Sequence, residues 1–156
     1  MEWKNLQETL EAYGHALEEA YRQEIVDNTA FASGRLFDSV RSVVEVDGHT
    51  IELSLSLEEY WKYVEEGRGP GRFPPLNKIE EWITMKNIAP YPDSRGKVPT
   101  VPQLAFLIGR SIAENGTEGK HLLDNALAHT EDWIRLIEEA IEADVSEEID
   151  EILKRL

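Results

Sequence analysis

The feature that most constrains the fold of this chain is a regular stripe of apolar side chains over its first 27 residues. The members of the stripe recur at spacings of three and four, which places them along one face of an α-helix. Glutamates and His15 fall on the opposite side, Glu18 among them. The pattern predicts one long helix over residues 2–27, with a buried stripe of Trp3, Leu6, Leu10, Tyr13, Leu17, Tyr21 and Ile25.

A β-hairpin is predicted over about residues 40–56. Asp47-Gly48 is a favoured two-residue turn, because both central positions of such a turn need positive φ. With this turn, the opposed pairs are Val46 with His49, Val44 with Ile51, and Val40 with Leu55. Val44, Ile51 and Leu55 then share one face, so the register and the apolar pattern agree.

Helices are expected through most of the remaining chain. Ser56 opens a capping box and predicts a helix that ends at Gly67. A second helix is expected over residues 77–86. Thr100 opens another capping box, and the strongly apolar helix after it, ending near residue 115, is expected to be the central buried one. Residues 121–128 are expected to be helical, and Thr130 starts a C-terminal helix.

The C-terminal helix carries two apolar stripes that are rotated relative to each other, which predicts a break or bend near residues 144–146, with one curved helix as the alternative. The segments over residues 67–75 and 87–99 are rich in proline and glycine and are expected to lack regular structure. The order of elements therefore predicts an α+β fold with a helical majority: a long N-terminal helix, a hairpin, then several helices.

The composition narrows the class of protein. The 156 residues suit one domain of ordinary size. There is no cysteine, which excludes disulfides and thiolate chemistry. No apolar run reaches the length of a membrane span, and the N-terminus has no signal-peptide pattern, so neither is expected.

The charge is strongly negative and unevenly distributed. The chain holds 31 acidic and 16 basic side chains, a net charge of −15, which argues against a general coat for nucleic acid. Residues 1–61 hold 13 acidic and 4 basic side chains, net −9, and residues 98–156 hold 13 and 5, net −8. Residues 62–97 hold 5 and 7, net +2, together with most of the prolines. The basic middle segment suggests a surface with its own role, although loops are often polar and rich in proline.

No catalytic, cofactor-binding or metal-binding site is expected. Glu11, His15 and Glu19 have the spacing of a chelating face, but a solvated face rich in glutamate is the favoured interpretation. His121, Asp124 and His129 could form a small polar group without matching a known ligand signature. No nucleophile motif, phosphate loop or paired carboxylate is present, so the sequence predicts a protein that is not an enzyme.

The best functional candidates lie on two exposed loops of the basic segment. Two arginines on a glycine- and proline-rich frame could contact DNA phosphates or an acidic neighbouring subunit. The alternative is that Arg68 merely caps the preceding helix or pairs with Glu65. The candidate interface residues are Arg68, Pro70, Arg72, Phe73, Arg95 and Lys97.

Several segments, in order along the chain, resemble one protein family. YWKYVEEGR at residues 60–68 is similar to the Y-x-x-x-V-E-x-G-[TR] segment of phage head–tail joining and tail-completion (neck) proteins of long-tailed phages. ASGRLFDSV at residues 32–40 resembles the turn between their first helix and their hairpin. FPP at 73–75, IEEWI at 79–83, QLAFLI at 103–108 and NGT at 115–117 look like a subgroup. In this resemblance the family fold is carried by Gly34, Tyr60, Val64, Glu65 and Gly67.

The resemblance covers roughly residues 1–128, and it implies a neck-like domain there, with residues 129–156 as a helical extension packed on its own chain or swapped to a neighbour. It further implies a non-enzymatic virion structural protein that forms a ring, commonly six-fold, at the head–tail junction. Its partners would be further copies of itself, connector or adaptor proteins, and tail-tube or tail-terminator proteins, near packaged DNA, with no membrane and no cofactor. It would reside in the virion, and in the host cytoplasm during assembly.

Two other functions remain open from the sequence. An acidic adaptor or inhibitor protein that binds a cellular partner, as a DNA mimic, would account for the net charge of −15. A nuclease or other hydrolase would require a role for His121 or His129.

Overall fold

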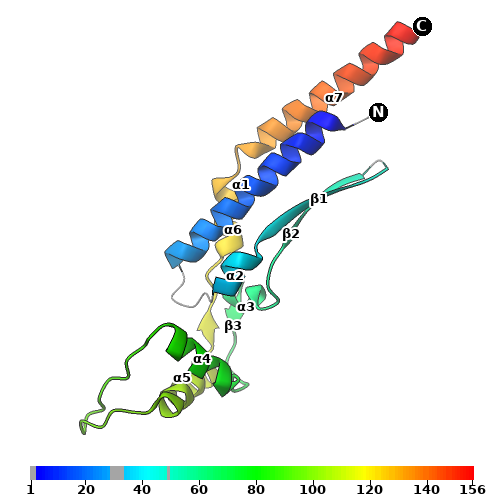
Figure 1. Ribbon diagram of the computed structural model, residues 1–156. Helices are drawn as coiled ribbons and strands as arrows, with labels where there is room; N and C mark the ends of the chain where they lie inside the picture. The colour runs from blue at the N-terminus through cyan, green and yellow to red at the C-terminus, as the bar shows by residue number, and fades with distance from the viewer. Residues whose placement is uncertain (1–2, 29–33, 49) are drawn as a thin grey trace. The chain divides into compact units, whose positions relative to one another are not determined.

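The computed structural model describes residues 3–28, 34–48 and 50–156. It confirms an α+β fold with a helical majority, a long first helix and a two-stranded hairpin (Figure 1). The elements are α1 (Lys4–Asn28), α2 (Gly34–Ser39), β1 (Arg41–Asp47), β2 (Thr50–Ser56), α3 (Trp61–Glu65), β3 (Gly67–Arg68), α4 (Leu76–Met85), α5 (Val101–Asn115), β4 (Thr117–Glu118), α6 (Leu122–His129) and α7 (Trp133–Arg155).

The chain divides into two compact units. Residues 1–61 and 121–156 form one, here called the helix–hairpin unit, and residues 62–120 form the other, the middle unit. The chain passes from one unit to the other at residues 61/62 and 120/121; the first boundary coincides with the change of charge in the sequence, and the second has no counterpart there. The proposed division after residue 128 stays a prediction.

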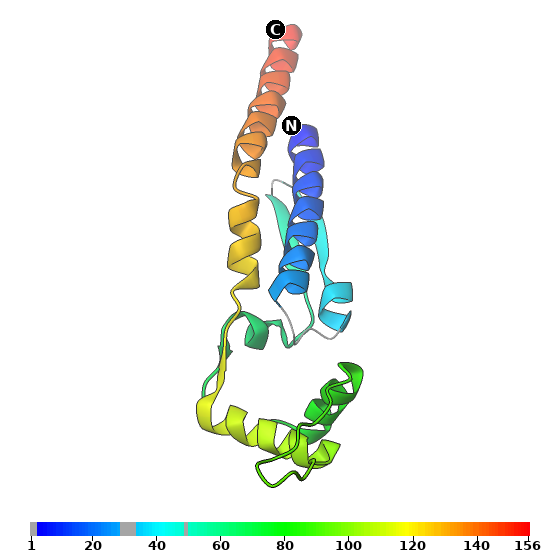
Figure 2. The ribbon, with the colours of Figure 1, turned by 90° about the vertical axis from the view of Figure 1, so that its left-hand side faces the viewer.

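Helix α1 is the centre of the helix–hairpin unit. It contacts α6, α7 and both strands of the hairpin, and two views show α6 and α7 following its length (Figures 1 and 2). The predicted apolar stripe faces these neighbouring elements. Leu17, Tyr21 and Ile25 are buried, and the ring centroid of Tyr13 lies 5.8 Å from that of Trp133 in α7. The apolar stripe therefore decides how α1 is oriented.

Glu18 is a correction to the predicted polar face of α1. It is buried, and its Oε1 accepts hydrogen bonds of 2.6 Å from both the backbone N–H and the Oγ of Ser42 in β1. Its Oε2 lies 3.2 Å from Nη2 of Arg22. Burial alone raises the pKa of Glu18, but the Ser42 hydrogen bonds and the Arg22 charge outweigh it, so the pKa lies below its usual value. Glu18 thus joins the helix to the hairpin.

The hairpin forms with a register different from the predicted one. Asp47 pairs with Thr50, Val46 with Ile51, and Val44 with Leu53. The predicted pairs were wrong by two residues, because Asp47 stays within β1 while Gly48 takes positive φ (59°). The predicted pairing of His49 lies outside the described residues. A shift of two residues keeps every side chain on its face, so Val44, Ile51 and Leu55 are still partly buried on one face, together with Leu53.

The predicted helix start at Ser56 was wrong. Ser56 is the last residue of β2 and pairs with Arg41, and the next helix begins only at Trp61. The serine that accepts a backbone N–H of this segment is Ser39 instead: its Oγ accepts the N–H of Glu58 at 3.0 Å. Strand pairing therefore prevails over the capping box, because the ladder holds Ser56 in an extended conformation.

The predicted bend near residues 144–146 was also wrong, because α7 is one continuous helix. Asp144 does not begin a new helix; it binds the first turn of α1. Its Oδ1 accepts the N–H and Nδ2 of Asn5, at 3.0 and 2.8 Å, and its Oδ2 accepts the N–H of Leu6 at 2.9 Å. Burial raises the pKa of Asp144, but the hydrogen bonds from Leu6 and Asn5 outweigh it and lower the pKa below its usual value.

The middle unit is built from α4, packed on α5, and a short two-stranded ladder. Its core is Ile79, Ile83 and Ala105. The predicted capping box is present: Thr100 accepts the N–H of Gln103, whose side chain accepts the N–H of Thr100. The prediction that α5 is a central buried helix was wrong, since Phe106 and Leu107 are each about half exposed.

Candidate interaction surface

A two-residue ladder anchors the glycine-rich segment that follows α3. Gly67 pairs with Glu118 and Arg68 with Thr117, so these first two residues of the segment have regular structure, contrary to prediction. Gly67 and Gly116 have φ of 76° and 75°. A Cβ at Gly67 would collide with the Thr117 carbonyl oxygen, and one at Gly116 with that of Arg68. Glycine is needed at both positions for the two backbones to approach.

The predicted arginine loop is closed by one of its own arginines. Nη2 of Arg68 donates a 2.7 Å hydrogen bond to the backbone carbonyl of Arg72. The N–H of Gly71 donates at 2.8 Å to the carbonyl of Ala113 near the end of α5. Pro70 and the Arg72 side chain are exposed. Arg68 thus contributes to the loop structure, and Arg72 is the charge that this loop presents to solvent.

Phe73 lies at the end of the same loop, against α5. Its ring centroid is 5.5 Å from that of Phe106, and part of the ring remains exposed. A Cβ at Gly109 would come within 2.7 Å of Phe73 Cε1. The missing side chain at Gly109 therefore makes room for Phe73.

Arg95 and Lys97 lie on a second loop, shaped by Asp93. Oδ1 of Asp93 accepts the backbone N–H groups of Arg95 and Lys97, both at 2.9 Å. The N–H of Asp93 donates to the Lys97 carbonyl, also at 2.9 Å, and Gly96 has φ of 76°. Both basic side chains are exposed. An aspartate that binds following N–H groups defines a tight turn, which presents both cations at its tip.

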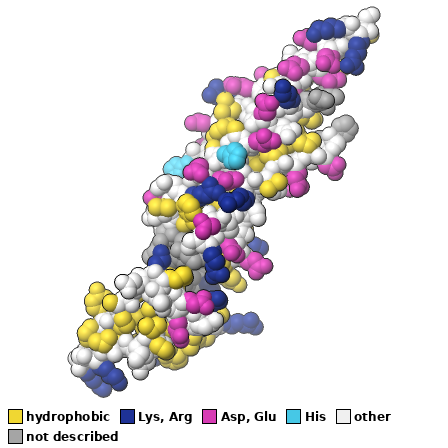
Figure 3. Space-filling model, viewed as in Figure 1, with side chains coloured by type: hydrophobic (Ala, Val, Ile, Leu, Met, Phe, Trp, Pro, Cys, Tyr) yellow, Lys and Arg dark blue, Asp and Glu magenta, His cyan; other side chains and the backbone are white. Residues whose placement is uncertain are grey.

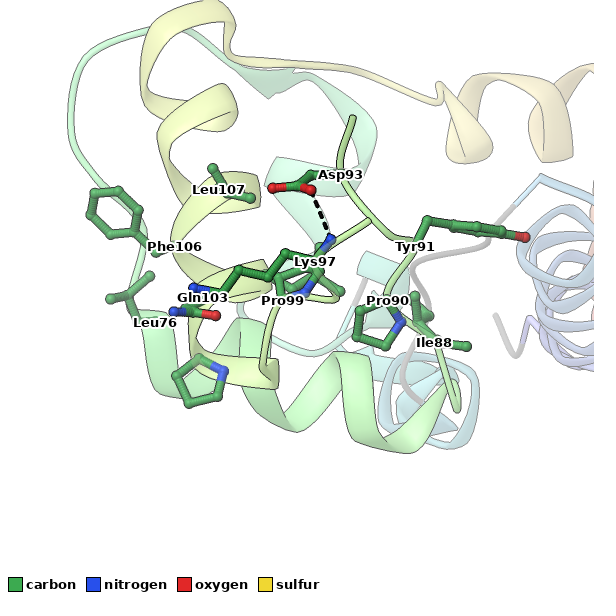
Figure 4. A pocket seen from close by; sticks show the side chains of 13 residues that line it. Leu76, Ile88, Pro90, Tyr91, Asp93, Lys97, Pro99, Gln103, Phe106 and Leu107 are labelled. Atoms are coloured by element: carbon green, nitrogen blue, oxygen red, sulfur yellow. Dashed lines mark hydrogen bonds between the residues drawn. The ribbon is translucent and has the colours of Figure 1, made fainter. Parts of the chain in front are cut away.

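A concave feature of the middle unit lies between this second loop and α5. It has a volume of about 860 Å³ and is open to solvent (Figure 4). We call it the apolar groove; most of its lining is apolar, and the charged groups on it are Asp93 and Lys97. Its lining includes Leu76, Ile88, Pro90, Tyr91, Pro99, Leu104, Phe106 and Leu107.

The apolar groove was not predicted, although the sequence held a signal for it. Helix α5 has more apolar positions than a single buried stripe can use. Ala105 and Gly109 face α4, whereas Phe106 and Leu107 point elsewhere and line the groove. Excess apolar width on a helix indicates either full burial or a second contact surface, and in α5 it is the second.

The residues of the family motif occupy several elements. Gly34 is the first residue of α2, Tyr60 and Val64 are partly buried, and Glu65 is buried. The carbonyl of Val64 accepts the N–H of Lys120 at 2.8 Å, next to the ladder of Gly67. These positions are structural in character, and the role of each in a family fold stays a prediction.

Two of the histidines, His121 and His129, contact acidic side chains within the helix–hairpin unit. Glu11 and His15 are exposed, and Glu19 pairs with Arg22 at 2.8 Å. Nδ1 of His121 lies 3.7 Å from Asp124 Oδ2. Nε2 of His129 lies 3.3 Å from Oε1 of the buried Glu24, whose Oε2 accepts Nδ2 of Asn125 at 3.1 Å. The contacts of Glu24 join α1 to α6.

The two units differ in net charge. The helix–hairpin unit holds 24 acidic and 7 basic side chains, net −17, and the middle unit holds 7 and 9, net +2. On the face in Figure 3, acidic side chains are spread along α1 and α7, whereas hydrophobic side chains gather over α4, α5 and the loop between them. The acidic and the apolar, weakly basic surfaces thus belong to separate units.

Comparison of the chain with protein-family models, curated proteins and solved structures finds no match. Within the described residues, no helix combines the length and the apolar character that crossing a bilayer requires.

Proposed function

We propose that this chain is a non-enzymatic structural protein of a phage virion, whose copies form a ring at the head–tail junction. The observation that carries the proposal is the separation of charge between the units, −17 against +2. In a ring, each copy presents one surface to the copy before it and a different surface to the copy after it. Surfaces of opposite charge in separate units suit such a head-to-tail contact.

The resemblance to neck proteins supplies the biological setting of the proposal. Its segments follow the family order along the chain, with ASGRLFDSV before the hairpin and YWKYVEEGR after it. The ring would bind a connector or adaptor protein, a tail-tube or tail-terminator protein, and further copies of itself. The exposed Arg72, Pro70, Arg95 and Lys97, together with Arg68 and Phe73, are the proposed contact residues.

Two measurements test the proposal. Native mass spectrometry of the purified chain should show a closed ring of identical copies, commonly six. Peptide mass spectrometry of purified particles should find the chain in a fixed ratio to the connector. A chain that stays monomeric at every concentration and is absent from particles contradicts the proposal.

A charge-reversed variant tests the basic loop within that function. Arg68→Glu combined with Arg72→Glu should leave the helical signal in circular dichroism intact, because the loop lies outside the helices, but should lower the yield of tailed particles. Arg72→Glu alone, which keeps the Arg68 hydrogen bond to the loop, should lower the yield as well. Lys78→Glu with Lys120→Glu makes the same change of charge at exposed positions of the same unit and is the matched control. Normal particle yield from the arginine variant would remove this loop from the proposed contacts.

The acidic adaptor or inhibitor remains the second candidate function, and the net charge of −17 on one unit favours it. Such a protein would bind a basic cellular partner in a salt-sensitive manner. Co-purification of one stoichiometric basic partner, with no ring and no particle association, would favour this function over the first.

A further inference from the structure

The last part of α7 extends beyond the helix that it packs against. Asp144 binds the first turn of α1, and residues 145–156 continue past that end (Figure 1). We call residues 145–156 the α7 tip. Its apolar side chains are exposed: Ile149 by 51%, Ile152 by 49% and Leu153 by 61%, with Val145 and Leu156 exposed as well.

These apolar side chains lie on one face of the helix. Val145, Ile149, Ile152 and Leu156 follow the spacing i, i+4, i+7, i+11, which forms a continuous stripe about 16 Å long at 1.5 Å per residue. Helical geometry places Glu148 and Arg155 along one edge of the stripe and Leu153 along the other, with Glu151 and Asp150 farther round the helix. Glu151 pairs with Arg155 at 2.9 Å. Glu147 and Lys154 fall on the far side. The tip is therefore an amphipathic segment with a net negative charge, four acidic side chains against two basic ones.

The apolar groove of the middle unit has complementary properties. Its lining is apolar, and its volume of about 860 Å³ lies in the range of sites that bury a ligand. The loop that supplies one wall of the groove, residues 86–100, places Asp93 and Lys97 on the lining and carries two further basic side chains, Lys86 and Arg95, nearby in the sequence. An amphipathic helix laid into an apolar groove is a recurring mode of recognition, in which the edge charges set the orientation.

We propose that the α7 tip of one copy docks in the apolar groove of the next copy. The inference rests on the proposed function in one respect, that copies of this chain associate, and it names the contact through which they do so. Tip and groove are different surfaces, so the contact is head-to-tail and generates a ring or a filament. Pairing of one tip with another is disfavoured, because it would bring together two segments that each carry a net negative charge.

The absence of cysteine from the chain permits a direct test with the full-length protein. Ile152→Cys places one thiol on the tip, and Leu107→Cys places one in the groove; both positions are exposed, so neither change should impair folding. Mixing the two single variants under mild oxidation should give a disulfide-linked dimer that contains one of each. Ile134→Cys, an exposed position in the first half of α7, replaces Ile152→Cys as the control and should give none.

The variant that carries both cysteines distinguishes the possible occupants of the groove. A ladder of covalent dimers, trimers and larger species supports docking between copies. A cross-linked monomer overturns the proposal, because the tip then occupies its own groove. Self-linking of Ile152→Cys without Leu107→Cys overturns it in favour of tip-to-tip pairing.

Charge exchange provides an independent test. Glu148→Lys with Glu151→Lys on the tip should weaken association about tenfold or more, as should Arg95→Glu with Lys97→Glu on the loop that supplies one wall of the groove. Mixing the two variants should restore it, whereas Glu147→Lys, on the far side of the tip, should have little effect. Failure of the mixture to restore association overturns the proposed contact.

The failure of this inference is distinguishable from that of the proposed function. If native mass spectrometry shows a ring and the chain is found in particles, yet no tip-to-groove disulfide forms, the inference fails and the proposed function stands. If the chain neither associates nor enters particles, both fail.

Discussion

Asp144 in α7 accepts a 2.9 Å hydrogen bond from the backbone N–H of Leu6, 138 residues earlier in the chain. With Asn5, it takes up two backbone donors of the first turn of α1, which no carbonyl within that helix can reach. A carboxylate at this end also interacts favourably with the helix dipole. One side chain of α7 thus caps α1 from outside.

Replacement of this cap should destabilise the helix–hairpin unit. Asp144→Asn keeps the shape but removes the charge and directs an amide donor toward N–H groups, so we expect a loss of about 1–3 kcal/mol in the free energy of unfolding. Urea denaturation followed by circular dichroism measures it. Asp150→Asn, an exposed site on the same helix, should change stability by no more than about 0.5 kcal/mol. Equal effects of the two variants would contradict the capping role.

The same cap makes stability depend on pH in the acid range. Asp144 and Glu18 both have a lowered pKa in the folded chain, so each stabilises the fold above its unfolded pKa of about 4. That stability is lost as pH falls through the folded pKa. The urea concentration at the midpoint of unfolding should therefore decrease as the pH is lowered below about 5. The difference in this midpoint between the native chain and Asp144→Asn should shrink toward pH 3. A difference that is constant from pH 7 to pH 3 would show that the charge of Asp144 is unimportant.

Gly67 offers a test of the ladder that holds the arginine loop. Gly67→Ala places a methyl group against the Thr117 carbonyl at positive φ, so we expect a loss of about 1–3 kcal/mol. Gly69→Ala is the control, because a Cβ there meets no atom of the described residues within 4 Å. Thermal unfolding of both variants gives the comparison. Similar melting temperatures would mean that the strand pairing adds little to stability.

The core of the middle unit should be sensitive at Ile83. This side chain is 1% exposed, whereas Met85 on the same helix is 62% exposed. Ile83→Ala should cost about 2–5 kcal/mol through lost burial and a residual cavity, and Met85→Ala should be close to neutral. Hydrogen exchange over residues 76–115 locates the effect. Unchanged protection of α4 and α5 in Ile83→Ala would contradict the assigned core.

The local elements could be predicted from the sequence because short-range patterns decide them. The stripe from Leu17 to Ile25, the capping box at Thr100 and the alternation in the hairpin each depend on residues a few positions apart. These patterns placed α1, α5 and the strands near their observed positions.

The same patterns misled where a distant partner competes with a local one. Ser56 has a capping-box sequence but pairs with Arg41 in the ladder. Glu18 lies on a polar face by its spacing, yet it is buried against Ser42 of β1. The apolar groove was not predicted because Leu107 and Pro90 line one pocket only through the packing of α5 and the loop before it.

The sequence by itself determined the fold class, the helical majority and the concentration of positive charge in the middle of the chain, because each follows from composition or from neighbours within a few residues. Only the tertiary structure decided that Asp144 caps α1, that the charge divides between two units as −17 and +2, and that an apolar groove and an exposed apolar helix tip occur in the same chain. These features depend on which distant segments come together, and the net energy of many weak contacts decides that.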